Sequence, residues 1–298
     1  MKKILFTSVL LLFTLVMGAQ TIKVSPKLEK GTKKTYVAEV VTNLLGMSEI
    51  KANTETDYIV TDVKPDGFVM ECVMTKFDSD AKKDDVMSRV FSITQEMIKG
   101  ITVRFETDKD GKPLRILNFD ELKKGMEAVV DKLLTEVLSQ APEAAALSKD
   151  DLKQQVLSSM TEDVLLQSMS VNTSPIALNG KTISLGLQDE YLNSNGLKMK
   201  RTYIPSANGT ITTTGVLSMT KDDMKQLVMK TAKERGGDMV DDTMIENILN
   251  SGMVKFEANE KAVYTLDTDG WVKSIKADVS SETMGMKTTA NSTIILKK

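Results

Sequence analysis

The stretch Lys-Lys-Thr-Tyr-Val-Ala-Glu-Val-Val-Thr, residues 33–42, decides the fold class of this 298-residue chain. Its side chains alternate between two sets, one of which is made of Tyr36, Ala38, Val40 and Thr42. Successive side chains of a β-strand point to opposite faces of a sheet, so a period of two predicts a strand.

The segments that follow extend this strand into a hairpin. Residues 50–62 are rich in Thr, Tyr and Val, and Pro65-Asp66-Gly67 has the composition of a tight turn. Beyond the turn, one strand face collects Phe68, Met70, Cys72 and Met74. These runs are longer than the usual strand of about five or six residues. That length predicts a large, curved sheet.

Outward from this hairpin, strand and helix patterns alternate to the end of the chain. Helices are expected over 83–99, 118–140, 148–165, 220–236 and 244–249, and further strands over 101–106, 114–116, 181–219, 262–266, 271–279 and 288–296. The chain is therefore expected to be an α+β protein, with a large curved mainly antiparallel sheet and helices packed on one face. No linker rich in Pro, Gly or Ser divides it, so residues 20–298 are expected to form a single elongated domain.

Two internal similarities leave a weak duplication open. Ser148-Lys-Asp-Asp resembles Thr220-Lys-Asp-Asp, and the turn at Asp110-Gly111 resembles that at Asp269-Gly270. The two pairs have different offsets along the chain, so one duplication does not explain both. Helix capping and hairpin turns explain each pair locally.

The N-terminus has the pattern of an export signal. Lys2 and Lys3 precede the apolar run 4–16, and the small residues Gly18 and Ala19 follow it. The run is shorter than the roughly 20 residues of a membrane span. We expect residues 1–19 to be a signal peptide, the protein to be periplasmic or extracellular, and the remaining chain to have no integral membrane segment.

Composition excludes several function classes. The chain has no histidine and one cysteine, which excludes His-ligated metal sites, Ser-His-Asp nucleophiles and cysteine clusters. Removing Lys2 and Lys3 takes the formal net charge from −2 to −4, and no basic stripe suggests nucleic-acid binding. We expect no catalytic residues, no metal, no cofactor and no nucleic-acid partner.

Acidic turns and carboxylate pairs are the remaining candidates for chemistry. Asp108, Asp110, Asp267 and Asp269 suggest calcium, but neither loop has the Gly and Glu of the helix–loop–helix calcium motif, and hairpin turns explain the Asp-Gly pairs. Ser48 with Lys51, and Ser79 with Lys82, match only the spacing of a serine–lysine nucleophile.

Methionine is the unusual residue type, with 19 in the chain. Flexible thioethers fill irregular cores, and they also line adaptable apolar grooves. The groove interpretation assigns ligand binding to Phe68, Met70, Met74 and Trp271. Cys72, on the same strand face as Phe68 and Met70, is expected to be a buried, inert thiol.

The layout resembles known protein groups at two levels. The entry Leu28-Glu-Lys-Gly31 leading to Tyr36, with the closing Asp269-Gly-Trp-Val-Lys-Ser274, is similar to uncharacterised secreted proteins of Gram-negative bacteria. Long antiparallel strands with helices on one face also resemble the half-barrel of periplasmic lipoprotein carriers and sorting factors. That resemblance implies a concave sheet that holds apolar chains.

Three hypotheses of function follow. The first is a non-catalytic envelope protein that binds an apolar, lipid-like ligand or a polypeptide of an envelope partner between sheet and helices. The second is a structural or surface interaction protein without a small-molecule site. The third, which we rank last, is a hydrolase that uses a carboxylate pair.

Overall fold

A computed structural model describes residues 21–43, 49–81, 86–140, 148–193, 197–220, 222–226, 228–229, 256–283 and 286–298. The predicted signal peptide, most of the predicted helix after Thr220 and the predicted helix at 244–249 lie outside these residues. At Thr220 itself, hydrogen bonds run from the Asp223 amide to the Thr220 hydroxyl and from the Thr220 amide to the Asp223 carboxylate. Such reciprocal bonds are typical of a helix start, as predicted.

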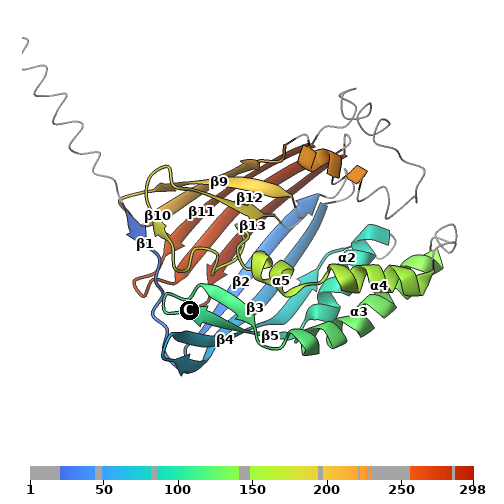
Figure 1. Ribbon diagram of the computed structural model, residues 1–298, viewed down its shortest axis with the longest axis horizontal. Coiled ribbons are helices and arrows are strands. Elements are labelled where there is room, and N and C mark those ends of the chain that lie inside the picture. Colours follow the sequence, from blue (N-terminus) through green and yellow to red (C-terminus); the bar gives the residue numbers. More distant parts are fainter. Residues whose placement is uncertain are drawn as a thin grey trace, which may run out of the picture.

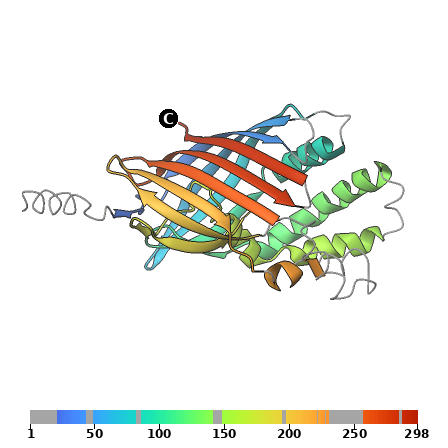
Figure 2. The same cartoon turned by 90° about the horizontal axis from the view of Figure 1, so that it is seen from above.

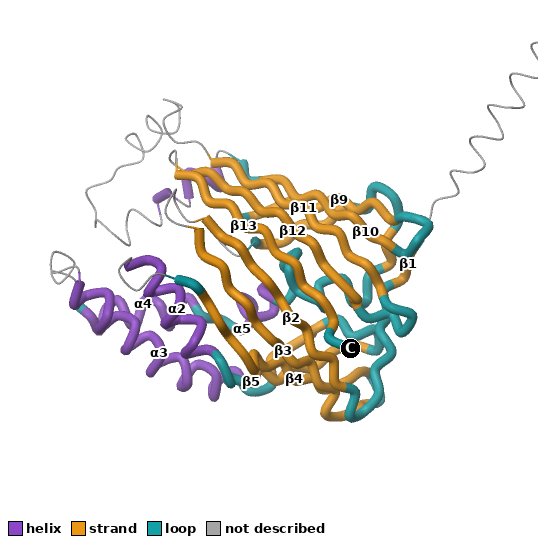
Figure 3. Tube along the Cα trace, turned by 180° about the vertical axis from the view of Figure 1, so that it is seen from behind, coloured by secondary structure: helices purple, strands orange, loops and turns teal. Residues whose placement is uncertain are grey.

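The main sheet has eleven strands in the order β6-β5-β4-β3-β2-β13-β12-β11-β10-β9-β8, and every neighbouring pair is antiparallel. Their bounds are β2 Lys33–Asn43, β3 Glu49–Lys64, β4 Gly67–Ser79, β5 Thr102–Asp108, β6 Pro113–Ile116, β8 Gln188–Leu192, β9 Lys198–Pro205, β10 Thr210–Leu217, β11 Phe256–Leu266, β12 Val272–Thr283 and β13 Met286–Leu296. Figure 3 shows most of these strands side by side from behind. The predicted mainly antiparallel sheet is confirmed.

The sheet is curved and open (Figures 1 and 2). Twisted sheets of more than about ten strands curl or split, which gives a physical reason for the curvature. Two β-bulges in the β3–β4 hairpin, where Thr61 and Thr75 are the extra residues, add local bending. The bulge at Thr75 also changes which side chains face inward, so that Phe77 and not Lys76 follows Met74 on the concave face.

The helices are α2 Val86–Ile98, α3 Phe119–Gln140, α4 Lys149–Ser159 and α5 Glu162–Ser168. The predicted helix over 148–165 is two helices, because Met160 has an extended backbone and Thr161 caps a new helix. Ser148 caps α4 as expected. Asn118 does not cap α3: its side chain accepts from the Arg104 amide and donates to the Thr102 carbonyl, and so extends the edge of β5.

The expected helical cover over one face is not confirmed. The main contacts of the helices with the sheet are α2 on β4, α3 on β5, and α5 on β6 and β8. Figure 1 shows α2, α3 and α4 together beside the β4–β5 side of the sheet. Among the described residues, no helix is long and apolar enough to cross a membrane.

An irregular segment, residues 169–181, lies inside the curve of the sheet and is called the inner segment here. Positions 174–179 along it are buried, including Ile176 and Leu178. Successive turns satisfy much of its backbone, for example Ala177 N to Ser174 O at 3.1 Å and Asn179 N to Ile176 O at 3.1 Å. It shares the main core with Phe105, Tyr264 and other concave residues of the sheet.

The start of the described chain packs against the end of the inner segment. β1 (Ile22–Lys23) pairs with β7 (Thr182–Ile183), and Val24, which is fully buried, exchanges backbone hydrogen bonds with residues 180 and 181. The Trp271 indole donates to the Lys27 carbonyl at 3.0 Å. Residues 22–28 therefore belong to the folded core.

Candidate functional site

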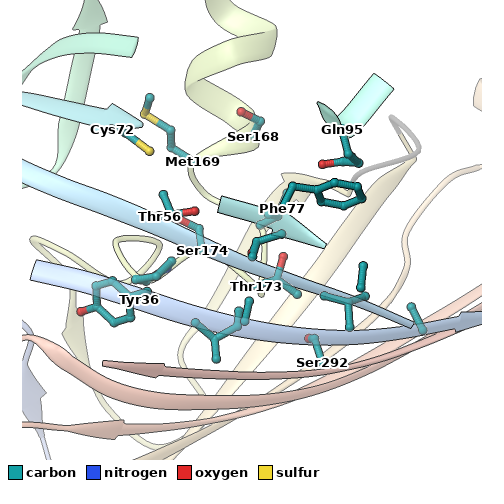
Figure 4. A pocket seen from close by; sticks show the side chains of 18 of the residues that line it. Tyr36, Thr56, Cys72, Phe77, Gln95, Ser168, Met169, Thr173, Ser174 and Ser292 are labelled. Carbon is teal, nitrogen blue, oxygen red and sulfur yellow. The ribbon is translucent and has the colours of Figure 1, made fainter. Parts of the chain in front are cut away.

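A cavity of about 650 Å³ lies between the concave face of the sheet and the elements α2, α5 and the inner segment. Figure 4 shows side chains from these elements around one space, with Tyr36, Thr56 and Ser292 on strands and Ser168, Met169 and Thr173 opposite. Its lining consists of Tyr36, Ala38, Val40, Ala52, Thr54, Thr56, Tyr58, Cys72, Phe77, Phe91, Gln95, Val103, Ser168, Met169, Val171, Thr173, Ser174, Pro175, Val279, Ala290, Ser292 and Ile294. The volume falls in the range of small-molecule sites.

Small side chains on three central strands leave this space open. On the concave face, Ala38 of β2 lies opposite Thr54 of β3 and Ile294 of β13. In the next row, Val40 lies between Ala52 and Ser292. Alanine, serine and threonine do not reach across the concavity, so the inner segment and the sheet do not meet here.

Aromatic pairs form walls beside the small residues. Tyr36 and Tyr58 meet edge to face, with ring centroids 5.7 Å apart, and the Tyr36 hydroxyl donates to the Val272 carbonyl at 2.7 Å. Phe77 of β4 and Phe91 of α2 meet edge to face at 6.2 Å. These contacts have the preferred geometry of aromatic pairs and join α2 to the sheet beside the cavity.

The described lining is electrically neutral. Its side chains are apolar, hydroxyl, phenol, thiol or amide groups. Burial raises the pKa of the Cys72 thiol to about 11, so the thiol is protonated at neutral pH and a poor nucleophile, as expected. Burial likewise raises the pKa of the Tyr58 hydroxyl, which is hydrogen-bonded with Cys72 and Ser174.

Some polar groups of the lining have no hydrogen-bond partner among the residues that the structure describes. Ser292 is only 8% exposed, yet among the described residues its hydroxyl makes no hydrogen bond. The same holds for the side chains of Thr54, Thr56 and Thr173. Buried polar groups are usually hydrogen-bonded, so these hydroxyls distinguish the cavity from ordinary core.

A buried polar cluster holds the inner segment next to the cavity. This cluster, the Arg201 cluster, consists of Asn172, Asp189, Tyr191, Arg201, Tyr203, Thr213, Glu260 and Tyr264. The Arg201 guanidinium binds both oxygens of Asp189, at 3.0 and 3.2 Å, and donates to Asn172 at 3.0 Å. The Asn172 side-chain amide donates to Glu260 at 2.9 Å, and the Asn172 backbone carbonyl accepts from the Tyr264 hydroxyl at 2.7 Å.

Both carboxylates of this cluster accept hydrogen bonds from other members of the cluster. Burial raises the pKa of Asp189, but hydrogen bonds and charge from Arg201, and then from Lys181, outweigh burial and hold the pKa below its ordinary value. Glu260 accepts from Asn172 and from Tyr191. Neither carboxylate lines the cavity, and the cluster therefore positions the inner segment.

None of the four residues predicted to bind ligand lines this cavity. Met70 and Trp271 are buried in the core, Phe68 packs against that core, and Met74 is half-buried on the same strand face as Cys72. Met169 is the one methionine in the described lining, so the cavity is not the methionine-lined groove that the composition suggested. A ligand contact of these four residues stays a prediction.

The two acidic turns are hairpin turns. The Asp108 carboxylate accepts from the amides of Asp110 and Lys112, both at 2.9 Å, and Asp267 accepts from the Thr268 amide at 2.7 Å. Among the described residues, no group of three or more His, Cys, Asp or Glu side chains could hold a metal ion.

Sequence patterns did not identify the cavity. The alternation in β2 and β3 did contain a signal, because Ala38, Ala52, Thr54 and Thr56 are small residues on one strand face. The opposite wall comes from the inner segment, which has no helical or strand period.

Comparisons with known proteins give only distant similarity. No family model and no curated protein matches the chain. Among solved structures, the chain is similar to lipovitellin, described for its lipid–protein interactions, with 9% identity and a TM-score of 0.37 over 93% of this chain. The match spans about a quarter, 26%, of the lipovitellin chain. An S-type phycobiliprotein lyase from Guillardia theta is similar with 6% identity and a TM-score of 0.21, over 89% of this chain and 87% of the lyase.

Proposed function

We propose that the protein is a non-catalytic, exported binding protein that holds an apolar ligand in the cavity between the sheet and the inner segment. The cavity itself carries this proposal: about 650 Å³ lined mainly by Ala, Val, Thr and aromatic side chains. Burial of aliphatic surface there stabilises a complex by about 25 cal/mol per Å². Export rests on the signal pattern of residues 1–19.

The arrangement around the cavity supports binding. The hollow lies over the central strands β2, β3 and β13, which are hydrogen-bonded on both sides and therefore rigid. The Arg201 cluster fixes the opposite wall through Asn172. A site preorganised on rigid elements loses little entropy when a ligand enters.

Filling the cavity tests the proposal. Ala38→Leu adds bulk in the middle of the lining, and we expect it to weaken binding of the uncharged fluorescent dye Nile red at least about tenfold. Val37→Leu, on the opposite face of the same strand, is the matched control and should leave the dissociation constant unchanged. Equal affinities for the two variants, with both folded by circular dichroism, would contradict the proposal.

Native mass spectrometry of the protein from its own envelope identifies the natural ligand. A co-purifying lipid that is lost from Ala38→Leu would support the binding role. An unliganded mass for both forms, together with no Nile red binding, would instead favour a structural role.

A further inference from the structure

We propose that the cavity selects uncharged amphiphiles, meaning an aliphatic chain joined to neutral hydroxyl or ester groups, over ionised lipids with the same chain. A monoacylglycerol is the simplest molecule of this class. The inference rests on the proposed function and goes further, because it names the chemistry of the ligand.

The first observation is that several hydroxyl groups of the lining have no hydrogen-bond partner among the described residues. Thr54 and Thr56 lie two residues apart on the concave face of β3, and Ser292 lies on β13, two strands away. Thr173 of the inner segment also lines the cavity (Figure 4). A hydroxyl group both donates and accepts a hydrogen bond, so this arrangement suits ligand hydroxyl and ester oxygens.

The cost of burying such hydroxyls explains why a purely aliphatic ligand fits less well. A hydrocarbon would cover Ser292 and its neighbours and leave them without water or a partner. Neutral oxygens on the ligand replace the lost hydrogen bonds. The lining therefore favours an amphiphile with polar groups inside the cavity over an alkane.

The neutral lining is the second observation. Every described lining residue is uncharged, and Arg201, a buried cation outside the lining, already binds Asp189 and Asn172. A carboxylate or phosphate taken into this space would lose its hydration without gaining a counter-charge. An ionised head group is thus disfavoured wherever it enters the lining.

A chain-matched pair of ligands tests the proposal. Displacement of Nile red from the purified, delipidated protein gives dissociation constants for 1-decanoylglycerol and for decanoate. At about pH 8, where a free carboxyl is ionised, decanoate should bind at least about tenfold more weakly. Lowering the pH to about 5 should narrow this difference, because protonation gives the neutral acid, while affinity for the glycerol ester should stay constant.

Two variants connect the selectivity to named groups. Ser292→Ala should weaken binding of 1-decanoylglycerol several-fold and by a larger factor than it changes Nile red binding, whereas Thr293→Val on the other face of β13 should change neither affinity. Thr54→Lys, if the variant binds Nile red, should shift the preference toward decanoate.

The outcomes separate the two proposals. Equal or tighter binding of decanoate at about pH 8 overturns the selectivity but leaves the binding function standing. Failure of Nile red and of both decanoyl compounds to bind overturns the proposed function as well. An unchanged ester affinity in Ser292→Ala overturns the assigned role of that hydroxyl.

Discussion

Arg201 shows how one residue organises the polar part of the interior. Its side chain is 1% exposed, and a buried guanidinium without counter-charge would be strongly destabilising. Asp189 binds it through both oxygens, and the ring of Tyr191 lies 4.4 Å from it. The same guanidinium donates to the Ser170 carbonyl at 3.1 Å, and this hydrogen bond also holds the inner segment in place.

Removing the Asp189 charge should change how the free energy of unfolding depends on pH. The native pKa of Asp189 lies below its ordinary value of 3.8, so its contribution is fully present above about pH 5 and is lost as the pH falls through the native pKa. Asp189→Asn leaves Arg201 without its counter-charge and should lower the free energy of unfolding by about 3 kcal/mol at neutral pH.

Urea unfolding at pH values from about 7 to 3 measures this effect. The difference in the free energy of unfolding between the wild type and Asp189→Asn should become smaller as the pH falls. Glu190→Gln, on the exposed neighbouring residue that pairs with Lys198, is the control and should change stability by less than about 1 kcal/mol. A gap that is independent of pH would show that Asp189 acts by shape and not by charge.

Among the elements, the inner segment is held in place by contacts with distant strands. It is neither helix nor strand, and most of its residues are buried or half-buried. Asn172 connects it to four elements, through Tyr191 of β8, Arg201 of β9, Thr213 of β10 and Glu260 of β11. These bonds hold the wall of the cavity against the C-terminal strands.

Loss of the Asn172 side chain should release the inner segment locally. Asn172→Ala leaves several buried partners unpaired, and we expect amide hydrogen exchange in residues 170–178 to accelerate about 100-fold, equivalent to about 3 kcal/mol. Exchange in β2 and β3 should stay as it is. Hydrogen exchange by mass spectrometry measures both regions, with Asn291→Ala, a change of an exposed side chain on β13, as the control. Equal acceleration in β2 would mean that segment and sheet open together.

In the whole molecule, β2 and β13, the first and the last strand of the main sheet in chain order, pair in the middle of that sheet. β13 pairs with β2 from Leu296 opposite Tyr36 to Thr289 opposite Asn43. Strands β3–β6 extend from β2 on one side, and strands β12–β8 extend from β13 on the other. The cavity draws its lining from both sides of this seam.

Deletion of residues 286–298 should therefore abolish cooperative unfolding. The truncated chain leaves β2 paired only with β3 and β12 paired only with β11, and it removes the wall that contains Ser292 and Ile294. We expect the sharp urea transition, followed by near-ultraviolet circular dichroism, to disappear. Removal of Lys298 alone should have no effect. A cooperative transition in the truncated chain would mean that the two halves fold independently.

The sequence was sufficient for most of the secondary structure and for the sheet. The alternation in 33–42, the turn at Pro65-Asp66-Gly67 and the cap at Ser148 each depend on residues a few positions apart. Such local patterns act through the period of the backbone and through short-range hydrogen bonds. One error was also local: Met160 interrupts the helix predicted over 148–165.

The site depends on contacts between distant parts of the chain. Ser292 lies beside Val40, and Asn172 donates to Glu260, although no local pattern relates these residues. Met70 and Trp271 are buried in the core and Phe68 packs against it, because large apolar side chains favour burial. Local periodicity thus determined which strands form, whereas long-range packing of small concave side chains against an irregular segment left the cavity.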